Sequence, residues 1–268
     1  MKLLHNPFFI LVLVALLILL LWILWANTAL TLTEYTASSE EIPSNFDGFR
    51  IAQVSDLHNA QFGKDSEKLL ELLAQSRPDM IAITGDLVDS RRTDCAVVID
   101  FVREAVQIAP VYYAPGNHES RIPDYAYLKS ELLAAGVAVL ENDSLAFYKE
   151  QDSITITGLM DPDFGIPMPN LTAENYQVVL SHRPELIDLY ADMGLDLVLT
   201  GHAHGGQIRL PFLGGILAPN QGFFPKYDSG MHFHGNTAMV VSRGLGNSLF
   251  PLRVGNRPEL ILITLESA

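Results

Sequence analysis

The chain opens with a long apolar run. Phe8–Ala26 holds nineteen apolar residues without interruption, and no residue from Leu3 to Thr33 carries a formal charge when histidine is neutral. At about 1.5 Å per residue such a helix spans about 28 Å, close to the hydrocarbon thickness of a bilayer. Trp22 and Trp25 lie at its far end, where indole rings favour the lipid–water boundary. We therefore expect a transmembrane helix.

A cleaved signal peptide is the alternative. It would have a shorter apolar core, of about 7–15 residues, followed by small residues spaced for cleavage. The stretch 26–29, Ala-Asn-Thr-Ala, fits such a site poorly. An anchor is the preferred interpretation.

The charges that flank the run indicate its orientation. Lys2 is the one basic residue before it, and Glu34, Glu40 and Glu41 are the first ionisable residues after it. By the positive-inside tendency the N-terminus stays in the cytoplasm, so a single-pass cell-membrane protein with an extracytoplasmic domain is expected. We divide the chain into an anchor (1–33), a linker that starts extended (34–45) and one folded domain (46–268).

The first part of the folded domain alternates strand-like and helical patterns. We expect strands at Arg50–Ser55, Met80–Thr84 and Val111–Ala114, and helices at Ser66–Gln75, Thr93–Ile108 and Asp124–Ala135. This βαβα rhythm predicts a sheet with helices on its faces.

After Gly136 the pattern changes to closely spaced strands. They are expected at Val137–Leu140, Leu145–Lys149, Ser153–Gly158, Gln177–Ser181, Leu195–Thr200, Gln207–Leu210, Thr237–Ser242 and Glu259–Leu265. So many strands favour an α/β fold of two packed sheets with helices outside over one open sheet.

Composition narrows the function classes. The chain has 17 basic and 31 acidic side chains, a net charge of −14, which argues against nucleic acid as a partner. Residues 34–268 hold 16 basic and 31 acidic residues, or −15, so anionic lipid would repel the domain unless an anchor holds it. The single cysteine, Cys95, excludes an intrachain disulfide.

Metal-binding side chains follow the ends of five apolar strands. The clusters are Asp56-Leu-His58, Gly85-Asp86, Gly116-Asn117-His118-Glu119, His182 and Gly201-His202-Ala-His204. In α/β folds ligands collect outside the carboxyl ends of strands, which is where all five clusters would fall.

Each cluster alone has an ordinary alternative, since a strand-end histidine is more often a turn or a hydrogen-bonded core residue. Taken together they favour a shared site, because five of the eight histidines lie in these clusters. Burying so many carboxylates and imidazoles without a metal would leave large unpaired desolvation costs.

These motifs, in this order, resemble the calcineurin-like metallophosphoesterase superfamily. Two later stretches resemble the membrane-associated bacterial branch of this superfamily, which includes UDP-2,3-diacylglucosamine hydrolase-like phosphodiesterases. They are Gly-His-Ala-His-Gly-Gly-Gln-Ile-Arg-Leu-Pro (201–211) and Ser-Arg-Gly-Leu-Gly (242–246). The resemblance covers about residues 46–266. It implies two packed mixed sheets flanked by helices, an αββα sandwich.

The resemblance also implies a ligand set for two divalent ions. Asp56, His58, Asp86 and His204 would hold the first, and Asp86, Asn117, His182 and His202 the second, with Asp86 bridging. Mixed oxygen and nitrogen donors suit Mn²⁺, Zn²⁺ or Fe better than Mg²⁺ or Ca²⁺. Two ions about 3.5–4 Å apart activate a bridging water, so hydroxide would attack the phosphorus directly.

Two further residues receive catalytic roles from the resemblance. His118 would protonate or polarise the leaving oxygen, since an imidazole has a pKa near operating pH. Asp89 resembles the carboxylate that orients this histidine, although a helix cap or turn residue is an equally good interpretation.

Several other residues remain ambiguous. Arg243, Arg253 and Arg257 could bind a phosphate, but structural ion pairs are favoured. His232 and His234 depart from the motif set and are interpreted as structural. Asp161 and Asp163 either line the mouth of the site or terminate a strand.

The leading hypothesis is a membrane-anchored phosphoesterase that hydrolyses a phosphate mono- or diester or a pyrophosphate. A lipid-linked or nucleotide-lipid ester is one candidate substrate, and the oligomeric state stays open. A catalytically silent scaffold of the same fold is the alternative, although such relatives usually lose ligands. A secreted nuclease is a third hypothesis, which the −15 domain charge opposes.

Overall fold

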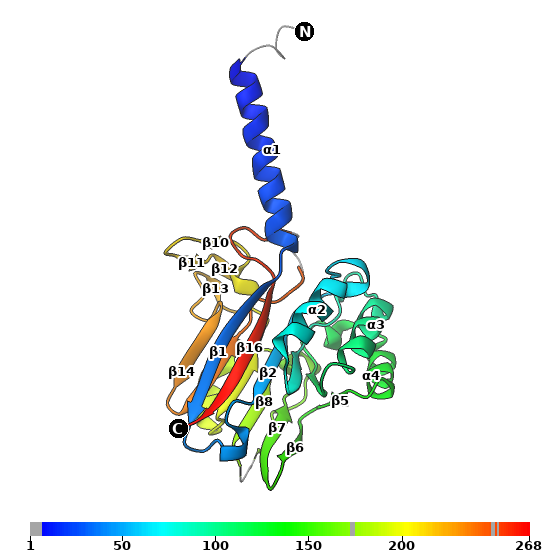
Figure 1. Cartoon of the computed structure of the whole chain (residues 1–268), viewed down its shortest axis with the longest axis vertical. Helices are drawn as coiled ribbons and strands as arrows, with labels where there is room; N and C mark the ends of the chain where they lie inside the picture. The colour runs from blue at the N-terminus through cyan, green and yellow to red at the C-terminus, as the bar shows by residue number, and fades with distance from the viewer. Residues whose placement is uncertain (1–6, 172–174, 248–249, 251) are drawn as a thin grey trace.

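The computed structural model describes residues 7–171, 175–247, 250 and 252–268. Lys2, on which the orientation argument depends, lies outside the described residues. Helix α1 (Pro7–Thr28) projects from the domain, and of its side chains only Ala26 is buried (Figure 1). Within these described ranges α1 is the one helix long and apolar enough to cross a bilayer. The expected N-terminal apolar helix is confirmed.

The first sheet has six strands in the order β1-β16-β2-β3-β4-β5. They are β1 (Thr31–Ser39), β16 (Glu259–Ser267), β2 (Arg50–Val54), β3 (Met80–Thr84), β4 (Val111–Ala114) and β5 (Ala138–Val139). β1 pairs in parallel with β16, β16 is antiparallel to β2, and β2 to β5 are parallel. β1 begins inside the range expected for the anchor.

The second sheet also has six strands, in the order β14-β15-β9-β8-β7-β6. They are β14 (Gly230–His234), β15 (Thr237–Val241), β9 (Leu197–Thr200), β8 (Gln177–Leu180), β7 (Asp152–Gly158) and β6 (Asp143–Lys149). The four central strands are parallel and the two edge strands are antiparallel to their neighbours. The expected two-sheet α/β fold is confirmed.

Helices cover the outer faces of both sheets. α2 (Glu67–Ser76), α3 (Cys95–Ala105) and α4 (Tyr125–Ala134) pack on the first sheet, close to their expected positions. α3 begins later than expected because the Asp94 carboxylate accepts a hydrogen bond from Val97 N and caps the helix. The short α5 (Ile187–Asp192) packs on the second sheet and was not expected. Single turns of 3₁₀ helix are η2 (Ser44–Phe46), η3 (Lys64–Ser66), η4 (Glu119–Arg121), η5 (Pro162–Phe164), η6 (Pro184–Leu186) and η7 (His204–Gly206).

The core between the two sheets follows from the two-residue period of a strand. In β16, Leu260 and Leu262 face α2–α4, whereas Ile261 and Ile263 face the second sheet. Strands buried on both faces read as continuous apolar runs, which is why Glu259–Leu265 stood out in the sequence.

Two small hairpins lie outside the main sheets. β10 (Arg209–Leu210) pairs with β11 (Gly214–Gly215), and β12 (Leu217–Ala218) pairs with β13 (Gly222–Phe223). The strand expected at Gln207–Leu210 is therefore only two residues long and joins neither six-stranded sheet. Pro211 follows it directly, and a proline cannot donate to a strand ladder.

The strand directions decide where a site at the strand ends will lie. β1 leaves α1 and runs away from it, and β16 runs the same way (Figure 1). Since β2 is antiparallel to β16, β2, β3 and β4 run back towards α1. Their carboxyl ends thus face the end of the domain from which α1 emerges.

The packing between the sheets gives a stability prediction. Leu199 is fully buried between them, so Leu199→Ala should lower the free energy of unfolding by about 2–5 kcal/mol. The matched control is Leu145→Ala on β6, a side chain that is 47% exposed, where we expect a change within about 0.5 kcal/mol. Urea unfolding of the full chain in detergent measures both. Equal changes in the free energy of unfolding for the two variants would contradict an apolar core between the sheets.

Candidate metal centre

Loops from both sheets bring the seven expected ligands to one place. Asp56 and His58 follow β2, Asp86 follows β3, and Asn117 follows β4. His182 follows β8, and His202 and His204 follow β9. All seven side chains are buried. The carboxyl ends of five strands therefore meet in one buried polar cluster.

One group of donor atoms comes from Asp56, His58 and His204. His204 Nε2 lies 3.4 Å from Asp56 Oδ1 and 3.3 Å from His58 Nε2. His58 Nε2 lies 3.9 Å from the same carboxylate oxygen. These atoms are close enough together for one ion to bind all three.

Asp86 lies between this group and a second one. Its Oδ2 is 3.7 Å from His58 Nε2 and 3.1 Å from His182 Nε2, and a second cluster joins Asp86, His182 and His202. The Oδ1 of Asn117 is buried without a hydrogen-bond partner, and Asn117 lines the same pocket. Asp86 is therefore placed to serve two metal sites.

The backbone at these positions is strained. Asp56, His58, Asp86, His202 and His204 all have φ between 47° and 63°, in the left-handed region that favours glycine. Such conformations persist only where the surroundings impose them, and they cluster at functional sites. Nothing in the sequence motifs predicted this feature.

Glu119 holds the turn that carries Asp86. This fully buried carboxylate accepts hydrogen bonds from Asp86 N at 2.9 Å, Gly116 N at 2.8 Å and Val88 N at 3.3 Å. A side chain on Gly116 would collide with Asp86, since its Cβ would lie 2.4 Å from Oδ1. The sequence showed Glu119 beside a ligand but gave it no role.

The stretch 242–246 holds the backbone around Asp56 through hydrogen bonds. Leu245 N donates to Ser55 O at 3.0 Å, and Gly246 N donates to Asp56 O at 2.7 Å. Gly246 must lack a side chain here, because a Cβ would lie 2.1 Å from Leu57 O. This Gly-rich motif is thus a backbone support for the first ligand.

Burial keeps several of the imidazoles neutral. It lowers the pKa of His58 to about 4, and it lowers the pKa values of His202 and His204 well below their usual range. A neutral imidazole has a lone pair available for a metal ion. These three histidines are therefore in the protonation state that metal binding needs.

His182 and Asp86 form a charged pair when no ion is present. Burial lowers the pKa of His182, but the nearby carboxylate of Asp86 outweighs this effect and raises the pKa to about 10. Burial likewise raises the pKa of Asp86, and the charge of His182 outweighs it, so that the pKa falls well below its usual range. An ion that binds His182 must displace this proton.

His118 lies beside the cluster with its ring fixed by Ser90. Its Nδ1 lies 2.9 Å from Ser90 N, which donates to it, and 3.5 Å from Asp89 Oδ1. A ring that accepts at Nδ1 carries its proton on Nε2, and Nε2 is 4.0 Å from Asp86 Oδ2. Burial lowers the pKa of His118.

Asp89 is engaged with the backbone and with an arginine. It is buried, its Oδ1 accepts from Arg91 N at 3.1 Å, and its Oδ2 lies 3.5 Å from Arg92 Nη2. Asp89 is therefore a turn residue whose carboxylate lies near His118, and its part in orienting that ring stays a prediction.

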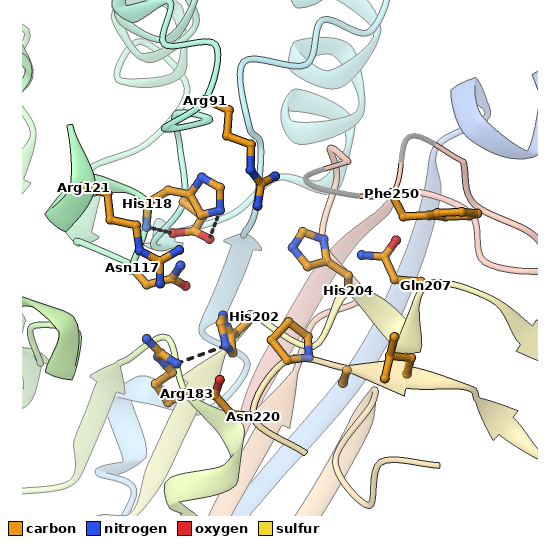
Figure 2. Close-up of a pocket in the computed structure, with 14 residues that line it drawn as sticks. Arg91, Asn117, His118, Arg121, Arg183, His202, His204, Gln207, Asn220 and Phe250 are labelled. Carbon is orange, nitrogen blue, oxygen red and sulfur yellow. Dashed lines mark hydrogen bonds and ion pairs between the residues drawn. The ribbon is translucent and has the colours of Figure 1, made fainter. Parts of the chain in front are cut away.

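Arginines surround the pocket that opens over this cluster. Figure 2 shows Arg91, Arg121 and Arg183 around the same space as His118, His202 and His204. Arg183 is buried, forms a bidentate pair with Asp161, and places Nη1 3.2 Å from His202 Nε2. Sequence reasoning missed these three arginines, because no spacing rule links them to the ligand motifs.

The ambiguous residues of the C-terminal part have structural partners. Arg243 pairs with Glu259 at 2.7 Å, and Arg253 donates to the carbonyl oxygens of Arg243 and Gly246. Arg257 donates to Ala29 O and Leu30 O. His234 pairs with Asp188 on the surface, and His232 lies 3.0 Å from Ser229 O.

Comparison with known proteins identifies the family. Residues 49–206 match the model of the calcineurin-like phosphoesterase family. The chain is 34% identical over 245 residues to the uncharacterized metallophosphoesterase YkuE of Bacillus subtilis, covering 88% of this chain and 85% of that one. It is 30% identical to the phosphodiesterase YaeI of Escherichia coli, covering 81% of this chain and 82% of that one.

More distant relatives agree on the architecture. The chain is 25% identical to a transmembrane protein with a metallophosphoesterase domain from Danio rerio, covering 85% of this chain and 56% of that one. The fold matches the crystal structure of TT1561 of Thermus thermophilus with a TM-score of 0.50 and 15% identity, over 74% of this chain and 90% of that one. The chain therefore belongs to the calcineurin-like phosphoesterase family, whose members are hydrolases of phosphoric-ester bonds.

Proposed function

We propose that this protein is a membrane-anchored phosphoesterase that works with two divalent metal ions. Asp56, His58, Asp86 and His204 would hold the first ion. Asp86, Asn117, His182 and His202 would hold the second. The observation that carries the proposal is the position of the Asp86 carboxylate between two groups of donor atoms.

The residues present fit such a pair of ions. Ligand atoms bound at about 2.0–2.2 Å from one ion lie roughly 3 Å apart, and the donor atoms around Asp56 and Asp86 are spaced in that way. The partnerless Oδ1 of Asn117 is a buried acceptor in need of a cation. Oxygen and nitrogen donors favour Mn²⁺, Zn²⁺ or Fe.

The chain's own residues would perform the remaining chemistry. When bound, a pair of ions supplies an activated water and neutralises charge on the phosphoryl oxygens. The guanidinium groups of Arg91, Arg121 and Arg183 would bind and orient the phosphate of the substrate. His118, with a proton on Nε2, would donate to the leaving oxygen.

Asp89 would act as a positioning residue. It sits 3.5 Å from His118 Nδ1 and fixes the turn whose Ser90 N–H donates to that atom. Its effect on the reaction would therefore pass through the orientation of the His118 ring.

The proposal includes the membrane topology of the chain. α1 would cross the membrane once, and the charges that flank it favour an extracytoplasmic domain. On that side a lipid-linked phosphoester is a candidate substrate, whereas a cytoplasmic domain would favour a nucleotide-lipid phosphoester.

Removing the bridging carboxylate tests the proposal directly. We expect Asp86→Asn to lower Mn²⁺-restored turnover of aryl phosphomono- and diesters by more than about a hundredfold, since even outer partners of metal ligands contribute about 10–100-fold. The matched control is Asp188→Asn, the same change at an exposed carboxylate, which should keep full activity. Full in vivo function of Asp86→Asn would instead favour the catalytically silent scaffold.

Metal binding should release a proton. Because Asp86 raises the pKa of His182 to about 10, the apo protein at pH 8.5 carries a proton on this ring that Mn²⁺ or Zn²⁺ must displace. Calorimetric titration of the full chain in buffers of different ionisation enthalpy should show about one more proton released per molecule by the native chain than by His182→Asn, because any proton lost by a metal-activated water is common to both. Equal proton release by the two proteins would contradict the assignment of His182 as a ligand.

The role of His118 predicts a dependence on the leaving group. His118→Gln keeps an acceptor for Ser90 N but lacks a group that can transfer a proton. We expect turnover of an alkyl phosphoester to fall by about a hundredfold or more, and that of a nitrophenyl ester far less, because a good leaving group needs no proton. An equal loss on both substrates, with unchanged metal content, would contradict the proton-donor role.

A further inference from the structure

The pocket opens at the end of the domain that meets α1. β2, β3 and β4 run back towards α1, and Asp56, Asp86 and Asn117 follow their carboxyl ends. The candidate metal centre is therefore at the end of the domain from which α1 emerges, and Figure 1 shows the position of that helix. This placement follows from strand pairing and does not depend on what the site binds.

Specific contacts fix the domain to the end of α1. The side-chain amide of Asn27 accepts from Arg253 N at 2.7 Å and donates to Arg253 O at 3.0 Å. The Arg257 guanidinium donates to Ala29 O and stacks 4.7 Å from the ring of Trp25. These four contacts across the junction orient the domain relative to the helix.

An unusual share of the exposed apolar side chains lies at this same end. Outside α1, fifteen large apolar side chains are exposed in the described ranges, and six of them lie within residues 209–224. Phe212 is 106% exposed and Phe223 is 74% exposed. We call Phe212, Leu213, Leu217, Phe223, Phe224 and Phe250 the apolar rim.

Two residues of the apolar rim have an unusual backbone conformation. Phe212 and Phe224 have φ of 68° and 53°, a conformation that is a genuine outlier for a bulky residue. Strain of this kind is retained where the exposed position of a side chain has a use. Isolated exposed apolar residues need no explanation, but a group of aromatic rings in adjoining hairpins does.

The apolar rim connects the anchor to the pocket. Arg209 N donates to Val254 O at 2.9 Å, which ties β10 to the residue next to Arg253 and so to Asn27. On the other side, Leu217 and Phe250 line the pocket that holds His202 and His204 (Figure 2). One continuous surface therefore runs from α1 to the mouth of the metal centre.

Acidic residues are sparse in the sequence at this end. Residues 209–227 contain Arg209 and Lys226 and no acidic residue, and residues 243–258 contain three arginines and no acidic residue, in a chain of net charge −14. Asp228 and Glu259, which directly follow these stretches, pair with Arg209 and Arg243, and Arg253 is fully buried. The exposed apolar side chains, rather than a basic patch, therefore carry the argument for a contact with lipid.

We propose that the apolar rim rests in the headgroup region of the same bilayer that α1 spans. The domain then contacts the membrane at two places, and the pocket mouth faces the lipid–water boundary. A consequence, which rests on the proposed function, is that the preferred substrates are phosphoesters displayed at the bilayer surface by an apolar tail.

The contact can be measured without any catalysis. In the full chain with Cys95→Ser, Phe212→Cys carries a fluorescent label, and the protein is reconstituted into vesicles of phosphatidylcholine and phosphatidylglycerol that contain shallow nitroxide-labelled lipid. The matched control is Phe233→Cys, which replaces a phenylalanine that is 70% exposed on β14, near Ser38 and Ser39 at the far end of β1. We expect several-fold stronger quenching at position 212 than at 233. Equal, weak quenching at both positions overturns the proposal.

The consequence for substrates has its own test. The triple variant Phe212→Ser/Phe223→Ser/Phe224→Ser should hydrolyse a water-soluble aryl phosphoester as the native chain does, but a diacyl phosphoester in the same vesicles several-fold more slowly. Equal rates on the vesicle substrate contradict the inference about substrates. If the native chain hydrolyses neither ester, the proposed function fails, while the quenching result still decides whether the surface contacts lipid.

Discussion

The shared position of one carboxylate, Asp86, is the constraint on which the site depends. It lies within 3.7 Å of His58 on one side and 3.1 Å of His182 on the other, and these two histidines belong to different sheets. Glu119 accepts a hydrogen bond from the backbone N–H of Asp86 and so fixes its position. Gly116 has no side chain and therefore leaves room for the Asp86 carboxylate. Because both sheets contribute donors around it, the sandwich must be closed for the centre to exist.

The packing of the two sheets also links helix α1 to the candidate metal centre. The stretch after β15 supports Asp56 through backbone hydrogen bonds, and a few residues later Arg253 is held by Asn27 at the end of α1. The parallel strands that deliver Asp56, Asp86 and Asn117 also run towards that helix. The apolar helix α1 and the candidate metal centre therefore share one end of the fold.

Much of this arrangement could be predicted from the sequence, because a ligand that directly follows a strand must lie at the end of that strand in the fold. Asp56, Asp86 and His202 each follow an apolar run, and the carboxyl ends of parallel strands meet in space. The left-handed backbone at these residues could not be predicted, since side-chain identity does not fix φ for Asp or His. Arg183 was also missed, because its place beside the pocket depends on a pairing with Asp161, which lies far away in the sequence.

Counting metal ions around Asp86 tests the central claim most directly. A crystal of the full chain soaked in Mn²⁺ should give two anomalous peaks per molecule, on either side of the Asp86 carboxylate and about 3.5–4 Å apart. A single peak, or none at saturating Mn²⁺, would contradict the account.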